Sequence, residues 1–191
     1  MPRTVTAHQE AAELLAEHMF VIPDFPLPGI RYIDYYRSVD RYPKVRGAVL
    51  RCFEERYRAL GVDAVAGIGG GGFGFGMCLA HALDVPFHSI RKAGDTVYDA
   101  LTTSVGMNYA QRSFTLASDV VTAGARVLLV DDTIASGGSA SGAVRLLREA
   151  GAEVVELAVL FEIPSKGGRE AIAPVPLFSV LRDEPAGAAA C

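Results

Sequence analysis

The sequence has few cysteines, no long apolar run and no excess of positive charge, and each shortage excludes a class of protein. The three cysteines, Cys52, Cys78 and Cys191, lie far apart and lack the paired spacing of a metal site or a disulfide scaffold. Such cysteines are typical of reduced thiols in the cytosol. No apolar stretch approaches the roughly 20 residues of a membrane span, and the amino terminus lacks the layout of a signal peptide. We therefore expect a cytoplasmic protein without a membrane partner.

The charge balance argues against nucleic acid as the main partner. The chain has 18 Lys and Arg against 22 Asp and Glu, so its formal net charge is −4. Proteins that bind nucleic acid usually present a basic patch to the phosphates, and no basic run stands out in this sequence. Half of the 191 residues are hydrophobic and 21% are charged, which predicts a single globular domain with a full core.

Strand and helix patterns alternate along the chain. The apolar spacing predicts strands at residues 63–68, 86–90, 113–117, 127–130, 153–162 and 177–181, and helices at 6–19, 43–60, 72–83, 141–151 and 165–171. Between them we expect a stiff, proline-rich loop at 21–30, a polar stretch at 93–111 and a loose tail at 183–191. The repeated β-α-β order predicts an α/β fold with a doubly wound, mainly parallel sheet.

Two adjacent carboxylates follow the predicted strand 127–130, where open α/β sheets bind ligands: Asp131 and Asp132. Five residues with little side-chain bulk come next and open a helix: Ala135, Ser136, Gly137, Gly138 and Ser139. Backbone N–H groups in such a turn form a cradle for phosphate. Because an ionised aspartate only accepts hydrogen bonds, we expect the acidic pair to bind vicinal hydroxyls instead. A phosphate beside a diol indicates a ribose 5-phosphate.

A second glycine-rich turn precedes the predicted helix 72–83, and it consists of Gly69, Gly70, Gly71 and Gly72. We interpret it as a second anion loop that faces the first, with Arg91 and Lys92 adding positive charge from the neighbouring strand. The same run also matches G-x-G-x-x-G, so an oxidoreductase that binds NADP is an alternative. Against that alternative, the acidic residue expected about 20 positions further on is missing.

Two anion loops around a diol site suit 5-phosphoribosyl 1-pyrophosphate (PRPP), which carries phosphate at both ends of a ribose. The stretch VLLVDDTIASGGSA resembles the donor-binding signature of the type I phosphoribosyltransferases. More narrowly, PDFPLPGI, AGIGGGGFGFG, IRK and GGREAIAPVPLFSVL resemble the adenine phosphoribosyltransferase family over nearly the full length. The resemblance implies a homodimer and Mg²⁺ bound through the donor. It also implies a flexible loop at about 93–112 and a hood at about 21–36 that holds the purine.

The same resemblance implies a role for each part of the site. Asp131 and Asp132 would hold the ribose hydroxyls, and the turn 135–139 would hold the 5-phosphate. Lys92 and the backbone of residues 69–72 would face the pyrophosphate. Phe25, in the hood, would lie near or against the base.

Several positions depart from the family pattern at the pyrophosphate and base ends. Gly71 stands where the family has an arginine that grips the pyrophosphate, and Ala93 and Asp95 replace basic residues. The base end differs at Arg31, which replaces an apolar residue, at Ile33, which replaces a base-pocket arginine, and at Asn108, which replaces a glutamate beside a retained Tyr109. An asparagine cannot take a proton at pH 7. These changes suggest altered chemistry at one half of the site.

We therefore expect a pentosyltransferase that moves a phosphopentosyl group from a 1-pyrophosphate donor to adenine and releases pyrophosphate. Another nitrogen heterocycle or an alcohol, in a nucleoside or natural-product pathway, is an alternative acceptor, and the donor sugar could be modified. A second hypothesis is a non-catalytic regulator that binds PRPP or a nucleotide. If the departures are adaptations, restoring an arginine at position 71 and a glutamate at position 108 is expected to raise activity toward adenine.

Overall fold

The computed structural model describes residues 5–25, 27–29, 32–92, 99–107 and 110–182. The helices are α1 (Ala7–Glu17), α2 (Tyr35–Arg41), α3 (Pro43–Arg58), α4 (Gly71–Leu83), α5 (Gly138–Glu149) and α6 (Gly168–Ala171), with a 3₁₀ turn at Pro164–Lys166. The strands are β1 (Val21–Ile22), β2 (Tyr32–Ile33), β3 (Ala64–Ile68), β4 (Phe87–Lys92), β5 (Ala100–Met107), β6 (Ala110–Ala117), β7 (Arg126–Ile134), β8 (Glu153–Glu162) and β9 (Leu177–Arg182).

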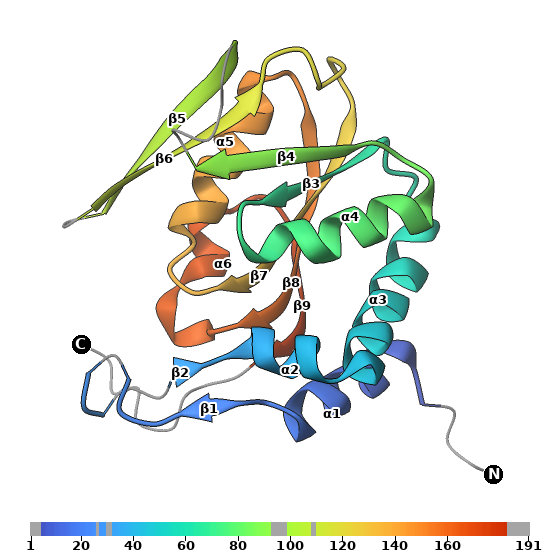
Figure 1. Cartoon of the computed structure of the whole chain (residues 1–191). Coiled ribbons are helices and arrows are strands. Elements are labelled where there is room, and N and C mark those ends of the chain that lie inside the picture. The colour runs from blue at the N-terminus through green and yellow to red at the C-terminus, as the bar shows by residue number, and fades with distance from the viewer. Residues whose placement is uncertain (1–4, 26, 30–31, 93–98, 108–109, 183–191) are drawn as a thin grey trace.

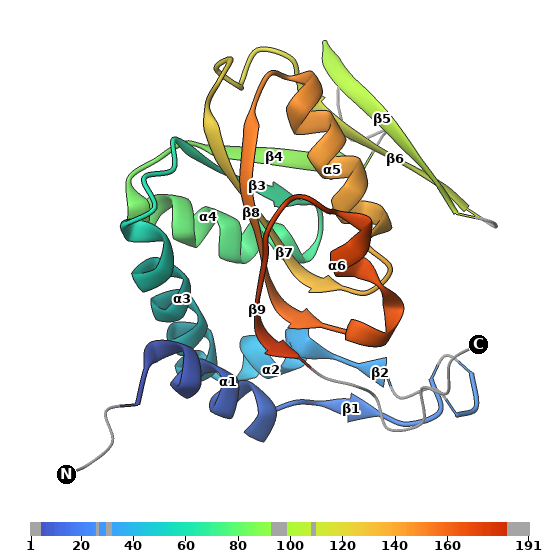
Figure 2. The ribbon, with the colours of Figure 1, turned by 180° about the vertical axis from the view of Figure 1, so that it is seen from behind.

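Seven strands form the central sheet in the order β5-β6-β4-β3-β7-β8-β9 (Figure 1). The five strands from β4 to β9 in this order are parallel, and β6 joins them antiparallel to β4. Helices lie on both faces: α4 with α1 and α3 on one, α5 and α6 on the other (Figure 2). The predicted α/β fold with a mainly parallel sheet is therefore confirmed.

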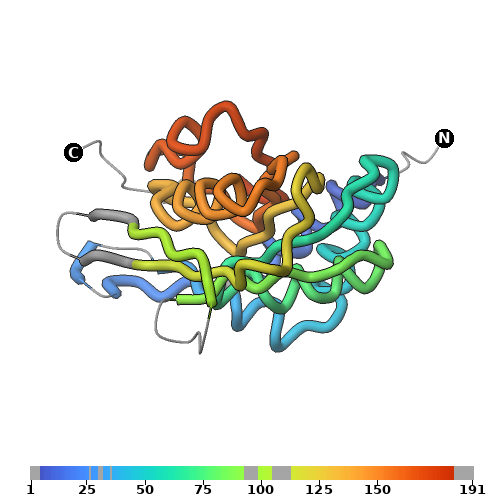
Figure 3. Tube along the Cα trace, turned by 90° about the horizontal axis from the view of Figure 1, so that it is seen from above, coloured from blue at the N-terminus to red at the C-terminus, as the bar shows by residue number. Residues whose placement is uncertain are grey.

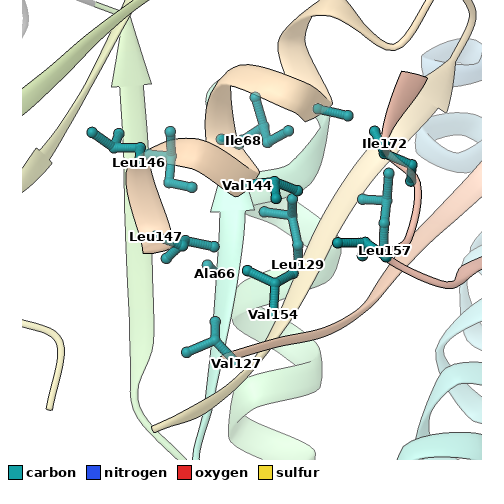
Figure 4. Packing of buried hydrophobic residues seen from close by; sticks show 14 of the residues in the cluster. Ala66, Ile68, Val127, Leu129, Val144, Leu146, Leu147, Val154, Leu157 and Ile172 are labelled. Carbon is teal, nitrogen blue, oxygen red and sulfur yellow. The ribbon is translucent and has the colours of Figure 1, made fainter. Parts of the chain in front are cut away.

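The central strands are apolar at consecutive positions because both of their faces are covered. Val127 and Leu129 belong to the core under α5, whereas Leu128 and Val130 belong to the core under α1, α3 and α4. Figure 4 shows the first of these cores, where Leu147 of α5 lies beside Ala66 of β3 and Val144 of α5 lies beside Leu129 of β7. This packing fixes the carboxyl ends of β3 and β7 next to each other.

Two peripheral segments lie on the same side of the molecule, as three views agree (Figures 1 to 3). One is the hairpin of β5 and β6, and the other is the short antiparallel pair of β1 and β2, which leads into α2. The strand predicted at 113–117 is confirmed as part of β6, whereas β5, within the predicted polar stretch, and β1, within the predicted loop 21–30, correct the expectation of irregular structure. The mobility predicted for 93–112 stays a prediction, and the tail 183–191 lies outside the described residues.

Among the residues that the structure describes, no helix is long and apolar enough to cross a lipid bilayer.

Candidate functional site

Two strand–turn–helix units meet at the carboxyl edge of the sheet. β3 passes through Gly69 and Gly70 into α4, and its neighbour β7 passes through Ala135–Gly137 into α5. A cavity of about 350 Å³ lies between the two turns. The predicted site residues that line it are Gly69, Gly70, Gly71, Lys92, Asp131, Asp132, Ala135, Ser136, Gly137, Gly138 and Ser139. Segments far apart in the sequence thus converge on one site.

The turn after β7 is open toward the cavity and supported from behind. Gly137 has φ +77° at the start of α5, a conformation that favours glycine, and it gives the helix no side-chain cap. A Cβ at this position would lie 2.8 Å from the carbonyl oxygen of Gly168, and one at Gly168 would collide with the carbonyl oxygen of Ala135. The first turn of α5 therefore turns its positive dipole end toward the cavity.

A buried ion-pair network holds α6 against this turn. Arg169 donates to both carboxylate oxygens of Glu162, at 2.9 and 2.6 Å, and Ser179 donates to the same carboxylate at 2.8 Å. Arg182 adds a second guanidinium at 3.3 Å. Burial alone would raise the pKa of Glu162, but the hydrogen bonds from Arg169 and Ser179 and the two positive charges outweigh it, so this pKa is lowered.

Asp131 is tied to the backbone of the other unit. Its carboxylate accepts the N–H of Asp132 at 2.9 Å and the N–H of Gly72 in the first turn of α4. The helix receives no side-chain cap from Gly70, so Asp131 takes that place. Burial and the neighbouring charge of Asp132 nevertheless raise the pKa of Asp131 well above its ordinary range.

Asp132 lies directly against Gly71. A Cβ at position 71 would overlap the carboxylate of Asp132 and also its Cβ, so rotation of the aspartate would not make room. On the other side, the hydroxyl of Tyr36 donates a hydrogen bond to Asp132. Burial, followed by the charge of Asp132 and this hydrogen bond, raises the pKa of Tyr36 to about 12.

Comparison with known proteins assigns the chain to a family. Residues 35–187 match the phosphoribosyl transferase domain. The adenine phosphoribosyltransferase of Bordetella parapertussis is 35% identical over 183 residues, which are 95% of each chain. The chain belongs to the adenine phosphoribosyltransferase family. It is a pentosyltransferase by family, and this membership confirms the resemblance predicted from the sequence and removes the support for an oxidoreductase that binds NADP.

Solved structures of this family share the fold. The adenine phosphoribosyltransferase of Rhodothermus marinus is 36% identical with a TM-score of 0.82, and the match covers 91% of this chain and 98% of that one. The enzyme from Saccharomyces cerevisiae, complexed with an imino-altritol bisphosphate and adenine, is 30% identical with a TM-score of 0.83. That match covers 90% of this chain and 98% of the yeast chain.

The departure at Gly71 has a structural reason. A side chain at position 71 would require Asp132 to move, because Asp132 occupies the space into which that side chain would extend. The expectation that Gly71→Arg together with Asn108→Glu raises activity toward adenine stays a prediction, and this contact argues against it. The glycine and the position of Asp132 therefore depend on each other.

The remaining predicted residues lie outside the cavity lining. Gly72 is buried, and a Cβ there would collide with the carbonyl oxygen of Val130, so it serves close packing. Arg91 donates to Ser89 at 3.1 Å. In the hood, Phe25 packs edge-on against Tyr32, with ring centroids 5.3 Å apart, and Ile33 pairs with Val21. Arg31, Asn108 and Tyr109, with Ala93 and Asp95, lie outside the described residues.

Sequence reasoning missed two polar groups at the site. Tyr36 was missed because a helix of seven residues gave no clear apolar period, although Asp34 caps its first turn. Thr133 lines the cavity, and its buried hydroxyl has no hydrogen-bond partner among the residues that the structure describes. Its position directly after the acidic pair could have identified Thr133 as a site residue.

Proposed function

We propose that this protein transfers the 5-phosphoribosyl group from PRPP to adenine and releases pyrophosphate. The observation that carries the proposal is the single cavity that joins the open turn 135–139 to Asp131, Asp132 and Lys92. A phosphate cradle, hydroxyl acceptors and a cation at these places match the three parts of the donor. The yeast relative holds a sugar bisphosphate analogue together with adenine.

In the proposed reaction, a ring nitrogen of adenine forms a bond to C1 of the ribose while the C1–O bond to pyrophosphate breaks. Pyrophosphate leaves with the electron pair, and the attacking nitrogen loses its proton to solvent or to the leaving group. The transition state resembles an oxocarbenium ion, so the protein contributes mainly position and charge. The turn 135–139 anchors the 5-phosphate, the acidic pair orients the ribose, and Lys92 faces the departing pyrophosphate.

The charge of the site supports a need for Mg²⁺. Of the described residues that line the cavity, three are charged: Lys92, Asp131 and Asp132. Two carboxylates and one ammonium do not neutralise a donor that carries three phosphates, and carboxylate and phosphate oxygens are ligands that Mg²⁺ accepts. The described residues contain no cluster of three or more His, Cys, Asp or Glu side chains. We therefore propose that Mg²⁺ would be held mainly through the donor, beside Asp131 and Asp132, and would supply positive charge for the departing pyrophosphate.

The acceptor end is proposed from family membership and the hood. Phe25 and Tyr32 offer exposed aromatic rings, at 49% and 42% exposure, on which a purine could stack. Gly71 in place of arginine implies slower loss of pyrophosphate than in relatives that carry it, and Asn108 implies that no carboxylate at that position shares the proton of adenine. We also propose a cytoplasmic homodimer, as the family resemblance implies.

The test is pyrophosphate release by the purified protein with PRPP, adenine and Mg²⁺. We expect release that requires all three, stops when EDTA removes the metal, and falls at least tenfold in Asp132→Asn, because a hydrogen bond to a charged group is worth about 1.5–3 kcal/mol. The matched control is Asp119→Asn, an exposed aspartate in the loop before β7. Donor binding without release would favour the non-catalytic regulator, and no donor binding would overturn both.

A further inference from the structure

Tyr36 lies on α2, outside the acidic pair and both glycine-rich turns. Its backbone is well fixed, because Asp34 accepts the N–H of Arg37 at 3.1 Å and caps the helix. Two residues further on, Ser38 is fully buried and accepts the N–H of Phe20 at 3.2 Å, and Val39 packs in the core under α1, α3 and α4. The fold, and not a surface rotamer alone, therefore brings Tyr36 toward the cavity.

The hydroxyl of Tyr36 reaches both glycine-rich and acidic parts of the site. It lies 3.7 Å from the point where a Cβ of Gly70 would stand, and it donates a hydrogen bond to the carboxylate of Asp132. The whole residue is 42% exposed. One end of the side chain thus faces solvent, and its polar end meets the acidic pair.

The two aspartates are held in different ways. Asp131 is fixed by two backbone N–H groups, those of Asp132 and Gly72. Asp132 has Gly71 against one side and the Tyr36 hydroxyl as its side-chain donor. A carboxylate has two oxygens and about four acceptor sites, so a bond from Tyr36 leaves room for hydroxyl groups of a sugar. The tyrosine can orient this carboxylate without blocking it.

We propose that Tyr36 is a positioning residue for the donor: its hydroxyl holds the Asp132 carboxylate in the orientation that accepts the ribose hydroxyls. The inference rests on the proposed function, because it takes the acidic pair as the ribose site. It also links the hood to the donor site through one hydrogen bond between α2 and the end of β7. A donor would therefore meet a carboxylate that is already oriented.

The test compares Tyr36→Phe, which removes only the hydroxyl, with Tyr32→Phe, which makes the same change in the same segment at the same 42% exposure. Calorimetry with ribose 5-phosphate and with PRPP and Mg²⁺ measures donor affinity, and steady-state kinetics measures KM and kcat. We expect Tyr36→Phe to weaken both ligands about 3- to 10-fold, the usual size of one net hydrogen bond. In Tyr36→Phe the KM for PRPP should rise by the same factor, while kcat and the KM for adenine change less than about twofold. The control Tyr32→Phe should bind the donor like the wild type.

A double-mutant cycle with Asp132→Asn separates positioning from a general structural effect. If Tyr36 acts through Asp132, adding Tyr36→Phe to Asp132→Asn costs little further affinity for ribose 5-phosphate. Equal losses in both backgrounds, or donor affinity unchanged in Tyr36→Phe, would overturn the inference while the proposed function stands. Failure of the wild type to bind either ligand would instead remove the proposed function itself.

Discussion

The β3–α4 and β7–α5 units have the same local topology but treat their helix N-termini differently. Each turn passes through a glycine with positive φ, +103° at Gly70 and +77° at Gly137, and neither glycine caps its helix with a side chain. At α5 the first turn faces the cavity with no acidic group bound to it among the described contacts. At α4 the N–H of Gly72 already donates to Asp131.

Because of this difference, the N-termini of α4 and α5 stabilise different negative charges. A helix N-terminus stabilises negative charge within about its first turn, so α5 is available for a phosphate of the ligand. The dipole of α4 instead stabilises the protein's own acidic pair, and Gly71 leaves the space that Asp132 fills. Under the proposed function, the two similar units would provide the two unlike parts of a ribose 5-phosphate site, an anion cradle and a diol acceptor.

The largest effect is expected where a side chain is added at Gly71. Gly71→Ala is expected to lower the free energy of unfolding by about 3 kcal/mol, the upper end of typical overpacking costs, because the new Cβ overlaps both the carboxylate and the Cβ of Asp132. Donor affinity should be lost with it. Urea unfolding and calorimetry with ribose 5-phosphate measure both effects.

Gly74 on the same helix provides the control. A Cβ there meets nothing within 4 Å, so Gly74→Ala should be neutral or stabilise the helix by up to about 1 kcal/mol. A Gly71→Ala variant with wild-type stability and donor affinity would show that Asp132 is not confined by α4.

A smaller effect is expected on the phosphate side, at Gly137. Gly137→Ala adds strain at φ +77° and a Cβ only 2.8 Å from the carbonyl oxygen of Gly168, for a total of about 2 kcal/mol. Gly124→Ala has nearly the same φ, +79°, and nothing within 4 Å, so it should cost only the strain, about 1 kcal/mol. Chemical denaturation of the two variants gives the difference, and equal losses would mean that α6 does not support the turn.

Much of the fold could be predicted because the central strands are covered on both faces and are therefore apolar throughout. The strand predicted at 153–162 has the bounds of β8. β5 was missed because its burial depends on polar contacts: Thr103 is buried and accepts from Arg145 of α5 at 2.8 Å, and Ser104 offers its carbonyl oxygen to the same guanidinium at 2.8 Å. Hydrophobic periodicity does not record such contacts.

The candidate site also has parts that could be predicted from the sequence and parts that could not. The turn 135–139 and the acidic pair adjoin in sequence, so their chemistry could be predicted together, and all of them line the cavity. The contact of Tyr36 with Asp132 and the contact of Gly71 with Asp132 depend on how separate elements pack. Neither contact can be predicted from a local sequence pattern. The sequence identified Gly71 as a departure, but only the packing against Asp132 explains it.

The smallest effect is expected at Asp131, the carboxylate that caps α4. Its pKa lies well above the ordinary value, because of burial and the charge of Asp132, so between the unfolded and folded pKa values the folded protein binds more protons at this group than the unfolded chain does. The contribution of Asp131 to the free energy of unfolding is therefore largest below the unfolded pKa of about 4. It is lost as the pH rises through the folded pKa. Asp131→Asn should avoid that loss and raise the melting temperature at pH 8 by about 2–4 °C.

Melting temperatures of the wild type and Asp131→Asn between pH 4 and pH 8 test this sign. The gain should shrink toward pH 4, while affinity for ribose 5-phosphate falls at neutral pH, because an amide is a weaker acceptor for hydroxyls than a carboxylate. Asp63→Asn is the matched control, since Asp63 also accepts a backbone N–H, that of Arg126 at 2.8 Å, at the exposed start of the same strand. If the gain in melting temperature of Asp131→Asn does not grow with pH, the buried charge of Asp131 does not destabilise the fold. A gain that does grow, together with lost affinity, would mean that Asp131 is kept for binding at the expense of stability.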